Sequence, residues 1–147
     1  MPIRQITPKS EIDAMIAASL KRREQALLYQ FAYIGESVVN LARTSRGYTD
    51  RTGNLVSSTG YVLVKDGAVV GTPYFATMKN GETGKNQGRE FAARKAAELI
   101  PSGIGIVVVA GMDYATHVEA RGQNVLKLSE IEAKKMVDQL FNDLKSR

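Results

Sequence analysis

Three side chains near the end of the sequence could together do acid–base or metal chemistry: Asp113, His117 and Glu119. In an extended segment His117 and Glu119 would project to the same side, where an imidazole and a carboxylate can exchange protons. The sequence contains one histidine, and a zinc site needs three or four nitrogen, sulfur or oxygen ligands at suitable spacing. Nothing nearby completes such a set. We therefore interpret the group as a polar contact surface, or as a carboxylate that holds a backbone turn, and a hydrolase as the weakest hypothesis.

The other residue types that commonly carry chemistry lack the partners they need. The chain has no cysteine, which excludes disulfides, thiolate metal ligands and a cysteine nucleophile. Lys85 is not followed by serine or threonine, so the glycines around it do not form a phosphate-binding loop. Ser57, Ser58 and Thr59 have no histidine in a recognisable motif, and polar strand positions explain them better. The sequence therefore predicts no enzyme, no cofactor and no metal.

The charge of the chain permits contact with nucleic acid but does not require it. Twenty basic residues against 15 acidic ones give a net charge of +5. The basic cluster Arg89, Arg94 and Lys95 lies on an expected helix, and such a cluster is more often a solvated helix face than a phosphate site. The six tyrosines are scattered instead of alternating with basic residues, so no platform for stacking single-stranded bases is indicated.

Length and hydropathy indicate one domain over residues 1–147. Hydrophobic residues make up 44% of the chain and charged residues 24%, which is ordinary for a globular protein. The longest apolar run, Ile104 to Met112 with glycine admitted, is far below the roughly 20 residues that a membrane span needs. The N-terminus has no apolar stretch of signal-peptide length, so we expect neither a membrane protein nor secretion by that route.

The N-terminal third of the sequence predicts a long amphipathic helix. Ser10 can cap its start, and apolar residues then recur at three- and four-residue spacing as far as Ala42. The charged residues 21–24 leave open whether this is one bent helix or two. Gly35 in its middle indicates a close approach by a neighbouring group, and Gly47 is expected to end the helix.

The next segment predicts a hairpin followed by an insertion. Strands are expected near Leu55 to Lys65 and Ala68 to Gly71, joined by Asp66-Gly67, a dipeptide that suits a two-residue turn. Residues 72–101 are expected to be an insertion between two strands of one sheet. It would consist of a polar, glycine-rich loop over residues 79–88 and a short amphipathic helix that ends before Pro101.

The last third predicts one more strand and a terminal helix. Ile104 to Ala110 shows no alternation, which fits a strand buried on both faces by helices or by a partner subunit. Residues 113–122 could form a strand or a single helical turn. Ser129 and Glu132 form a capping box before a helix of about four turns. The expected fold is α+β: a small antiparallel sheet, made of the hairpin and the buried strand, packed against a long N-terminal helix and a C-terminal helix, with an inserted loop and helix.

Two stretches of the sequence resemble the signatures of a known family. Residues 50–58 (Asp-Arg-Thr-Gly-Asn-Leu-Val-Ser-Ser) and 114–122 (Tyr-Ala-Thr-His-Val-Glu-Ala-Arg-Gly) resemble the pair D-x-T-G-x-L-x-x-S and Y-A-x-x-V-E-x-x-G. This pair is typical of the neck or tail-completion proteins, also called minor tail components, of long-tailed bacteriophages. The resemblance covers about residues 20–145 if the insertion is omitted. The matching residues are Asp50, Thr52, Gly53, Leu55, Ser58, Tyr114, Ala115, Val118, Glu119 and Gly122.

The resemblance implies a structural virion protein without enzymatic activity. It would assemble into a homo-oligomeric ring between the head connector and the tail, with double-stranded DNA passing through the ring. Its partners would be copies of itself, connector or portal-side proteins and tail or tail-terminator proteins. It would be found in the host cytoplasm during assembly and afterwards in the neck region of the virion.

Two alternatives to a neck ring stay open. The chain has Asn124-Val125-Leu126 where the family usually has a Pro-Phe-Leu-like start to the last helix, and its insertion is longer than expected. Both departures leave a tail-terminator ring as an alternative. The basic cluster leaves a nucleic-acid-binding module as the other one, and this module would bind less tightly as salt rises. The apolar and hairpin-edge surface exceeds what a compact monomer needs, which favours an assembly protein.

Overall fold

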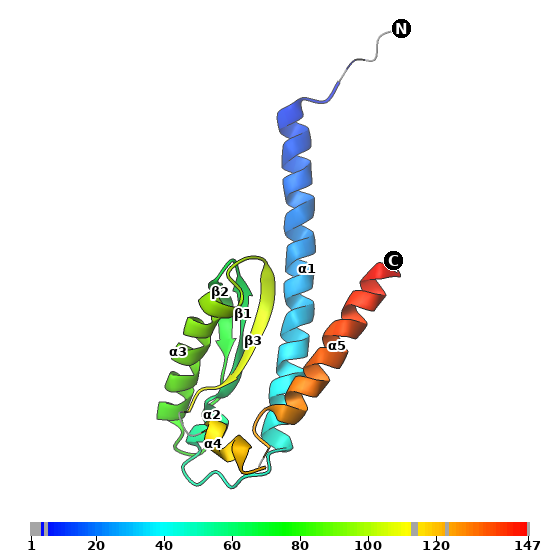
Figure 1. The fold of residues 1–147 in the computed structure, drawn as a ribbon. Coiled ribbons are helices and arrows are strands. Elements are labelled where there is room, and N and C mark those ends of the chain that lie inside the picture. The colour runs from blue at the N-terminus through cyan, green and yellow to red at the C-terminus, as the bar shows by residue number, and fades with distance from the viewer. Residues whose placement is uncertain (1–3, 5, 113–114, 123, 147) are drawn as a thin grey trace.

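The chain folds as α+β, as its sequence predicts (Figure 1). The computed structural model describes residue 4 and residues 6–112, 115–122 and 124–146, without the side chains of residues 116–118. In chain order the elements are α1 (Lys9–Thr44), α2 (Asn54–Ser57), β1 (Thr59–Lys65), β2 (Ala68–Tyr74), α3 (Glu82–Leu99), β3 (Ile104–Ala110), α4 (Ala115–Ala120) and α5 (Lys127–Lys145).

The sheet is antiparallel, with strand order β2-β1-β3. The predicted hairpin is confirmed: Asp66 and Gly67 both have positive φ, 50° and 81°, which is the pattern of a type I′ turn. Lys65 and Ala68 therefore face each other at the end of the hairpin. β1 pairs with β3 along its whole length, so β1 is the central strand.

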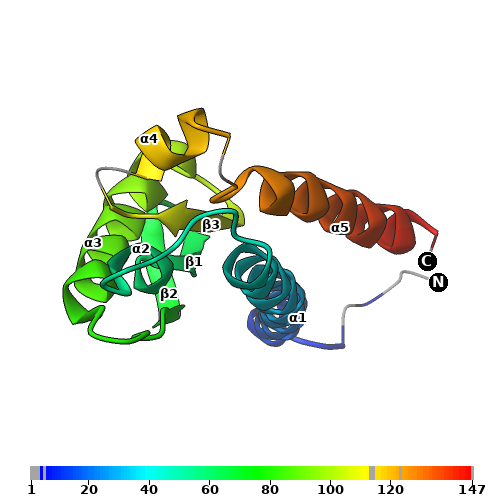
Figure 2. The same cartoon turned by 90° about the horizontal axis from the view of Figure 1, so that it is seen from below.

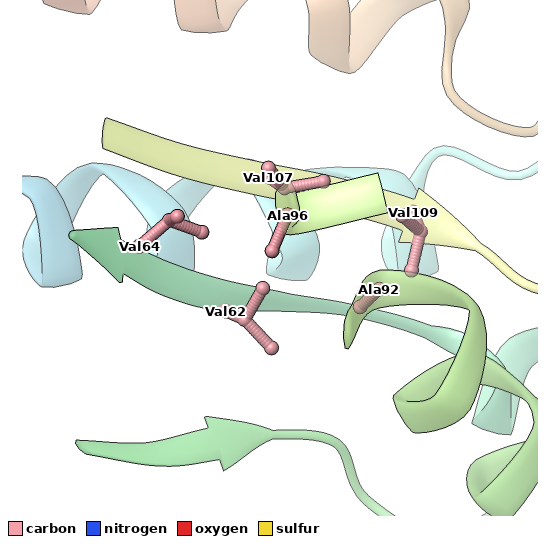
Figure 3. Packing of buried hydrophobic residues seen from close by; sticks show 6 residues of the cluster. All are labelled: Val62, Val64, Ala92, Ala96, Val107 and Val109. Carbon is pink, nitrogen blue, oxygen red and sulfur yellow. The ribbon is translucent and has the colours of Figure 1, made fainter. Parts of the chain in front are cut away.

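Helices cover both faces of this sheet. Figure 3 shows the face toward α3, where four valines from β1 and β3 meet two alanines. The opposite face packs against α1, which in turn contacts α5 (Figure 2). Because both faces are covered, alternation between polar and apolar residues disappears in β3, and the predicted burial of this strand on both faces is confirmed. The residues toward α3 are Val62, Val64, Val107 and Val109 with Ala92 and Ala96; those toward α1 are Leu63, Ile104, Ile106 and Val108 with Phe31, Ile34 and Val38.

α1 is one continuous helix of 36 residues, which decides between the two alternatives that the sequence left open. The predicted close approach at Gly35 is confirmed, since a Cβ there would lie 2.7 Å from ring atoms of Tyr61. Two predicted boundaries were wrong. The helix begins after Pro8 without a side-chain cap from Ser10, and it ends at Thr44, before Gly47.

The predicted loop over residues 79–88 was also wrong, because α3 already begins at Glu82. Gly84 and Gly88, one turn apart, face the short helix α2. A Cβ on Gly84 would lie 2.1 Å from the carbonyl oxygen of Asn54, and one on Gly88 would lie 2.5 Å from that of Ser58. Glycine is needed here for close packing between two helices, although its low helix propensity suggests a loop. α3 is therefore a core helix of 18 residues and not a short helix at the end of a loop.

Three more boundaries differ from the predictions. The first strand begins at Thr59, since residues 54–57 form α2, and the second continues to Tyr74 through an irregular register. The last helix begins at Lys127. The predicted capping box is not formed, because Ser129 is buried inside the helix and its hydroxyl has no hydrogen-bond partner among the described residues.

Candidate functional site

Asp50 of the first signature holds a tight backbone turn at the start of α2. Its Oδ1 accepts a hydrogen bond from the Gly53 N–H (3.0 Å) and its Oδ2 accepts one from the Val56 N–H (2.9 Å). The residue is only 6% exposed, so water cannot take the place of either oxygen. The Thr52 hydroxyl accepts a further bond from the Asn54 N–H (3.2 Å). These bonds satisfy N–H groups that a helix start otherwise leaves unpaired.

The same turn is joined to the chain that follows β2. Gly53 has φ of 81°, and a Cβ there would lie 2.0 Å from the Met78 carbonyl oxygen, so only glycine fits. The Met78 N–H donates to the Ser57 hydroxyl (2.8 Å), and the Lys79 ammonium donates to the Asp50 carbonyl oxygen (2.5 Å). The serines of the signature therefore act in helix and loop contacts and not as strand positions, which corrects the prediction for Ser57 and Ser58.

Leu55 and Ser58, the last two matching residues of the first signature, are both buried. The Ser58 hydroxyl donates to the Leu55 carbonyl oxygen (2.7 Å) at the end of α2. Thr59, which begins β1, donates to the same oxygen (3.1 Å). The hydroxyls close the short helix and direct the chain into the sheet.

Glu119 of the second signature caps α5. Its carboxylate accepts hydrogen bonds from the Val125 N–H and from the Lys127 N–H (2.8 Å). A negative charge at this helix start also interacts favourably with the helix dipole. Gly122 has φ of 77° and donates from its N–H to the Glu119 carbonyl oxygen (3.0 Å), so it ends α4 in the usual left-handed conformation. Tyr114 and the side chain of Val118 lie outside the described residues.

The tertiary structure brings the two signatures together. Leu55 from the first and Ala115 from the second belong to one buried cluster, together with residues that precede or follow each signature. In Figure 1, α2 and α4 lie at the same end of the sheet, close to the start of α5. The signatures thus form a buried contact that holds α2, α4 and α5 in place relative to the sheet. The cluster consists of Tyr48, Leu55, Val56, Ala115 and Val125, with Ala110, Met112 and Leu126 against it.

The acid–base group proposed from the sequence is only partly described. Asp113 and the side chain of His117 lie outside the described residues, and both oxygens of Glu119 accept backbone hydrogen bonds. In the described part of the chain, no group of three acidic or histidine side chains could hold a metal ion. The absence of enzymatic activity stays a prediction. No helix in that same part is long and apolar enough to cross a bilayer.

The basic cluster on α3 does not form one patch. Lys95 makes an ion pair with Glu98 (2.9 Å), and its ammonium lies 5.7 Å from the ring centre of Phe91. Arg89 and Arg94 are exposed, but five residues along a helix place them roughly 140° apart around its axis. The cluster therefore presents two separate arginines and a paired lysine to solvent.

Sequence reasoning missed the role of Arg43. Its guanidinium donates to the Thr59 carbonyl oxygen of β1 (2.8 Å) and lies 5.7 Å from the Tyr74 ring centre. Burial lowers the pKa of Arg43, while Tyr74 and Tyr48 oppose that shift. An arginine stays charged under these conditions. Arg43 therefore links the end of α1 to the sheet.

The N-terminal half of α1 is uncovered and projects beyond the sheet and α5 (Figure 1). All residues from 9 to 23 are exposed except the partly exposed Ser19. This half nevertheless carries large apolar side chains, of which Leu20 is 60% exposed. We call this surface the α1 stripe: Ile12, Met15, Ile16 and Leu20.

Comparison of the chain with protein-family models, with curated proteins and with solved structures finds no match in any of the three.

Proposed function

We propose that the chain is a structural virion protein that forms a homo-oligomeric ring in the neck of a long-tailed bacteriophage. The ring would join the head connector to the tail, and double-stranded DNA would pass through it. The paired signatures support the family. Their role as a buried contact between elements of one chain fits a protein that presents a rigid body to its neighbours. The observation that carries the proposal is the α1 stripe, which needs a partner outside the chain.

The α1 stripe continues a face of the helix that is already buried. Further along α1, Leu27, Phe31, Ile34 and Val38 follow the same three- and four-residue spacing and pack against the sheet and α5. Glu24 still pairs with Lys65 of β1 (2.7 Å), and Arg23 and Ala26 line a pocket with Leu140 and Leu144 of α5. Upstream of Arg23 the apolar residues of this face are all exposed. The uncovered residues, from 9 to 22, extend for about 21 Å at the rise of an α-helix. An isolated helix of this kind is marginal in water, so it gains most from packing against another subunit.

Two double variants test this proposal in the full-length chain. Ile16→Glu/Leu20→Glu places two charges on the α1 stripe, and Ala14→Glu/Ala18→Glu places the same charges on the opposite side of the same helix half. Both pairs lie outside the folded body, so folding should survive in each. We expect the first pair to weaken self-association by at least about 100-fold, since each buried large side chain contributes about 1.5–3 kcal/mol. The control should change it by less than about threefold.

Light scattering at a series of concentrations measures the association. An unchanged oligomer in the stripe variant, or a strictly monomeric chain that is absent from purified virions, would contradict the proposal. A tail-terminator ring would pass the same association test. Imaging of virions distinguishes the two roles, because it shows on which side of the connector the ring lies. The nucleic-acid module has no specific support, since the basic cluster is divided between two sides of α3.

A further inference from the structure

A groove opens between α1 and α5 where the two helices diverge (Figure 1). At its closed end α5 packs against α1, where Met136 and Leu140 belong to the cluster around Phe31. Toward the end of α5 the two helices separate, and Leu144 is 48% exposed. We call the space of about 780 Å³ between them the α1–α5 groove. Its lining includes Arg23, Ala26 and Leu27 of α1 and Leu140, Asp143 and Leu144 of α5.

The shape of the α1–α5 groove fits the end of a third helix. Two helices that diverge leave room between them for another one at the usual distance of about 8–10 Å between helix axes. Because α5 contacts α1 at the closed end, such a helix enters from the open end only. The N-terminal half of α1 projects on this open side (Figure 1). A helix that enters with its N-terminus first therefore runs antiparallel to α1.

The chain itself contains a helix segment with the required surface. Residues 9–22 of α1 extend for about 21 Å and carry the α1 stripe, whose side chains are exposed. The segment continues without a break into the part of α1 that forms one wall of the groove. It therefore cannot turn back into the groove of its own chain and can fill only the groove of another copy.

The charges along this segment are arranged for an antiparallel contact with a second copy. Glu11 and Asp13 lie near its start, and the basic residues Lys21, Arg22 and Arg23 follow at its end. At least eight residues, or about 12 Å, separate the two groups on one helix. In the described part of the chain none of the five forms an ion pair. Two antiparallel copies bring the acidic start of each beside the basic end of the other.

The same pairing follows from positions around the helix axis. At 100° for each residue, Glu11 lies on one flank of the α1 stripe with Arg22, and Asp13 lies on the other flank with Lys21. Equal flanks meet when a helix pairs with an antiparallel copy of itself. Two charges at this segment do not follow the pattern: Lys9 near its start, and Glu24 after its end, which already pairs with Lys65.

We propose that two copies of the chain pair through α1 in antiparallel orientation, each placing the start of its helix in the α1–α5 groove of the other. A two-fold axis near Ala17 puts Asp13 level with Lys21 of the other copy. Ile12 then lies at the mouth of the groove, and Ile6, which is 94% exposed, reaches into it. The contact is isologous and does not depend on the ring, because two copies complete each other's grooves without a further neighbour. A ring built from such pairs contains an even number of subunits.

Disulfide trapping tests the pair in the full-length chain, which has no cysteine of its own. Near the two-fold axis Ile16 of one copy meets Ile16 of the other, so oxidation should link Ile16→Cys into dimers. Ala14→Cys, on the opposite side of the same helix, is the matched control. A disulfide needs Cα atoms within about 7 Å, so we expect at least about tenfold more linked dimer from Ile16→Cys. Electrophoresis without reductant measures the yield.

Two further cysteine variants test the orientation. Ile12→Cys mixed with Arg23→Cys should give linked heterodimers, because these positions are level with each other in the antiparallel pair. Ile12→Cys alone should not form linked dimers, since its two copies lie about 15 Å apart along the helices. Linked dimers of Ile12→Cys alone would show a parallel pair and overturn the inference.

Charge reversal gives an independent readout. Glu11→Lys/Asp13→Lys makes both ends of the segment basic, and Lys21→Glu/Arg22→Glu makes both ends acidic. Each variant alone should associate about tenfold more weakly than the unmodified chain, and an equimolar mixture should recover the lost affinity. Light scattering at a series of concentrations measures both, and a mixture that stays weak would overturn the pair.

The outcomes separate this inference from the ring. An oligomer that persists without linked Ile16→Cys dimers overturns the pair and leaves the ring standing. Linked pairs that form nothing larger support the pair and contradict the ring. Absence of any association at high concentration overturns both.

Discussion

Replacing Asp50 by alanine removes both acceptors of a buried turn, and the cost follows from the geometry. The two hydrogen bonds are 3.0 and 2.9 Å long, the donors belong to Gly53 and Val56, and all three residues are buried. A hydrogen bond to a charged group contributes about 1.5–3 kcal/mol, and a buried donor left without a partner pays its full desolvation cost. Two such bonds give an expected loss of about 3–5 kcal/mol from the free energy of unfolding.

Asparagine at the same position separates the effect of losing a hydrogen-bond acceptor from the effect of losing side-chain volume. The amide keeps one oxygen but turns an NH₂ group toward the second backbone N–H, so Asp50→Asn should cost about 2–3 kcal/mol. The matched control is Asp66→Asn in the hairpin turn, where one carboxylate oxygen accepts a bond from the Gly103 N–H (2.8 Å) at an exposed site. Water replaces that bond, so the control should cost less than about 1 kcal/mol.

Urea unfolding at pH 7, followed by far-ultraviolet circular dichroism, measures all three variants against the unmodified chain. The comparison is meaningful if the dependence of the unfolding free energy on urea stays constant. A loss below about 1 kcal/mol for Asp50→Ala would refute the assignment of Asp50 as an internal cap. A variant that folds normally but no longer associates would refute it too, because the signature would then act directly in subunit contacts.

Three further predictions concern single positions. Gly35→Ala should lower the free energy of unfolding by about 1 kcal/mol, because the clash with Tyr61 outweighs the gain in helix propensity. In a Tyr61→Val background the same change should become stabilising. A change that stays destabilising there would contradict the contact between Gly35 and Tyr61. Glu119→Gln should cost about 1 kcal/mol and speed amide exchange at residues 125 and 127, and unchanged exchange would exclude the cap. Burial, with Glu36 and Tyr74 nearby, raises the pKa of Tyr61 to about 12, so the folded chain keeps a proton that the unfolded chain loses above pH about 10. Stability is therefore full below that pH and falls as the pH rises toward 12, a loss that Tyr61→Phe should remove in urea unfolding from pH 9 to 12.

The sequence by itself determined the elements whose signal is local. The Asp66-Gly67 turn, the apolar run of β3 and the spacing of apolar residues along α1 each depend on neighbours in the chain, and each prediction was confirmed. Gly35 also belongs here, since a glycine inside a strong helical pattern indicates a close contact even when the partner is unknown. These signals were sufficient for the α+β class.

The tertiary structure decided what depends on distant residues. The glycines of α3 resemble a loop until α2 is seen packed against them, and Glu119 caps a helix that begins eight residues later, so local propensity misplaced both helix starts. The two signatures meet in one cluster because the sheet carries the chain back to the same end. Likewise, the α1 stripe has the same pattern as the buried part of its helix. Only the packed structure shows which part of that face is covered, because burial depends on elements far away in the sequence.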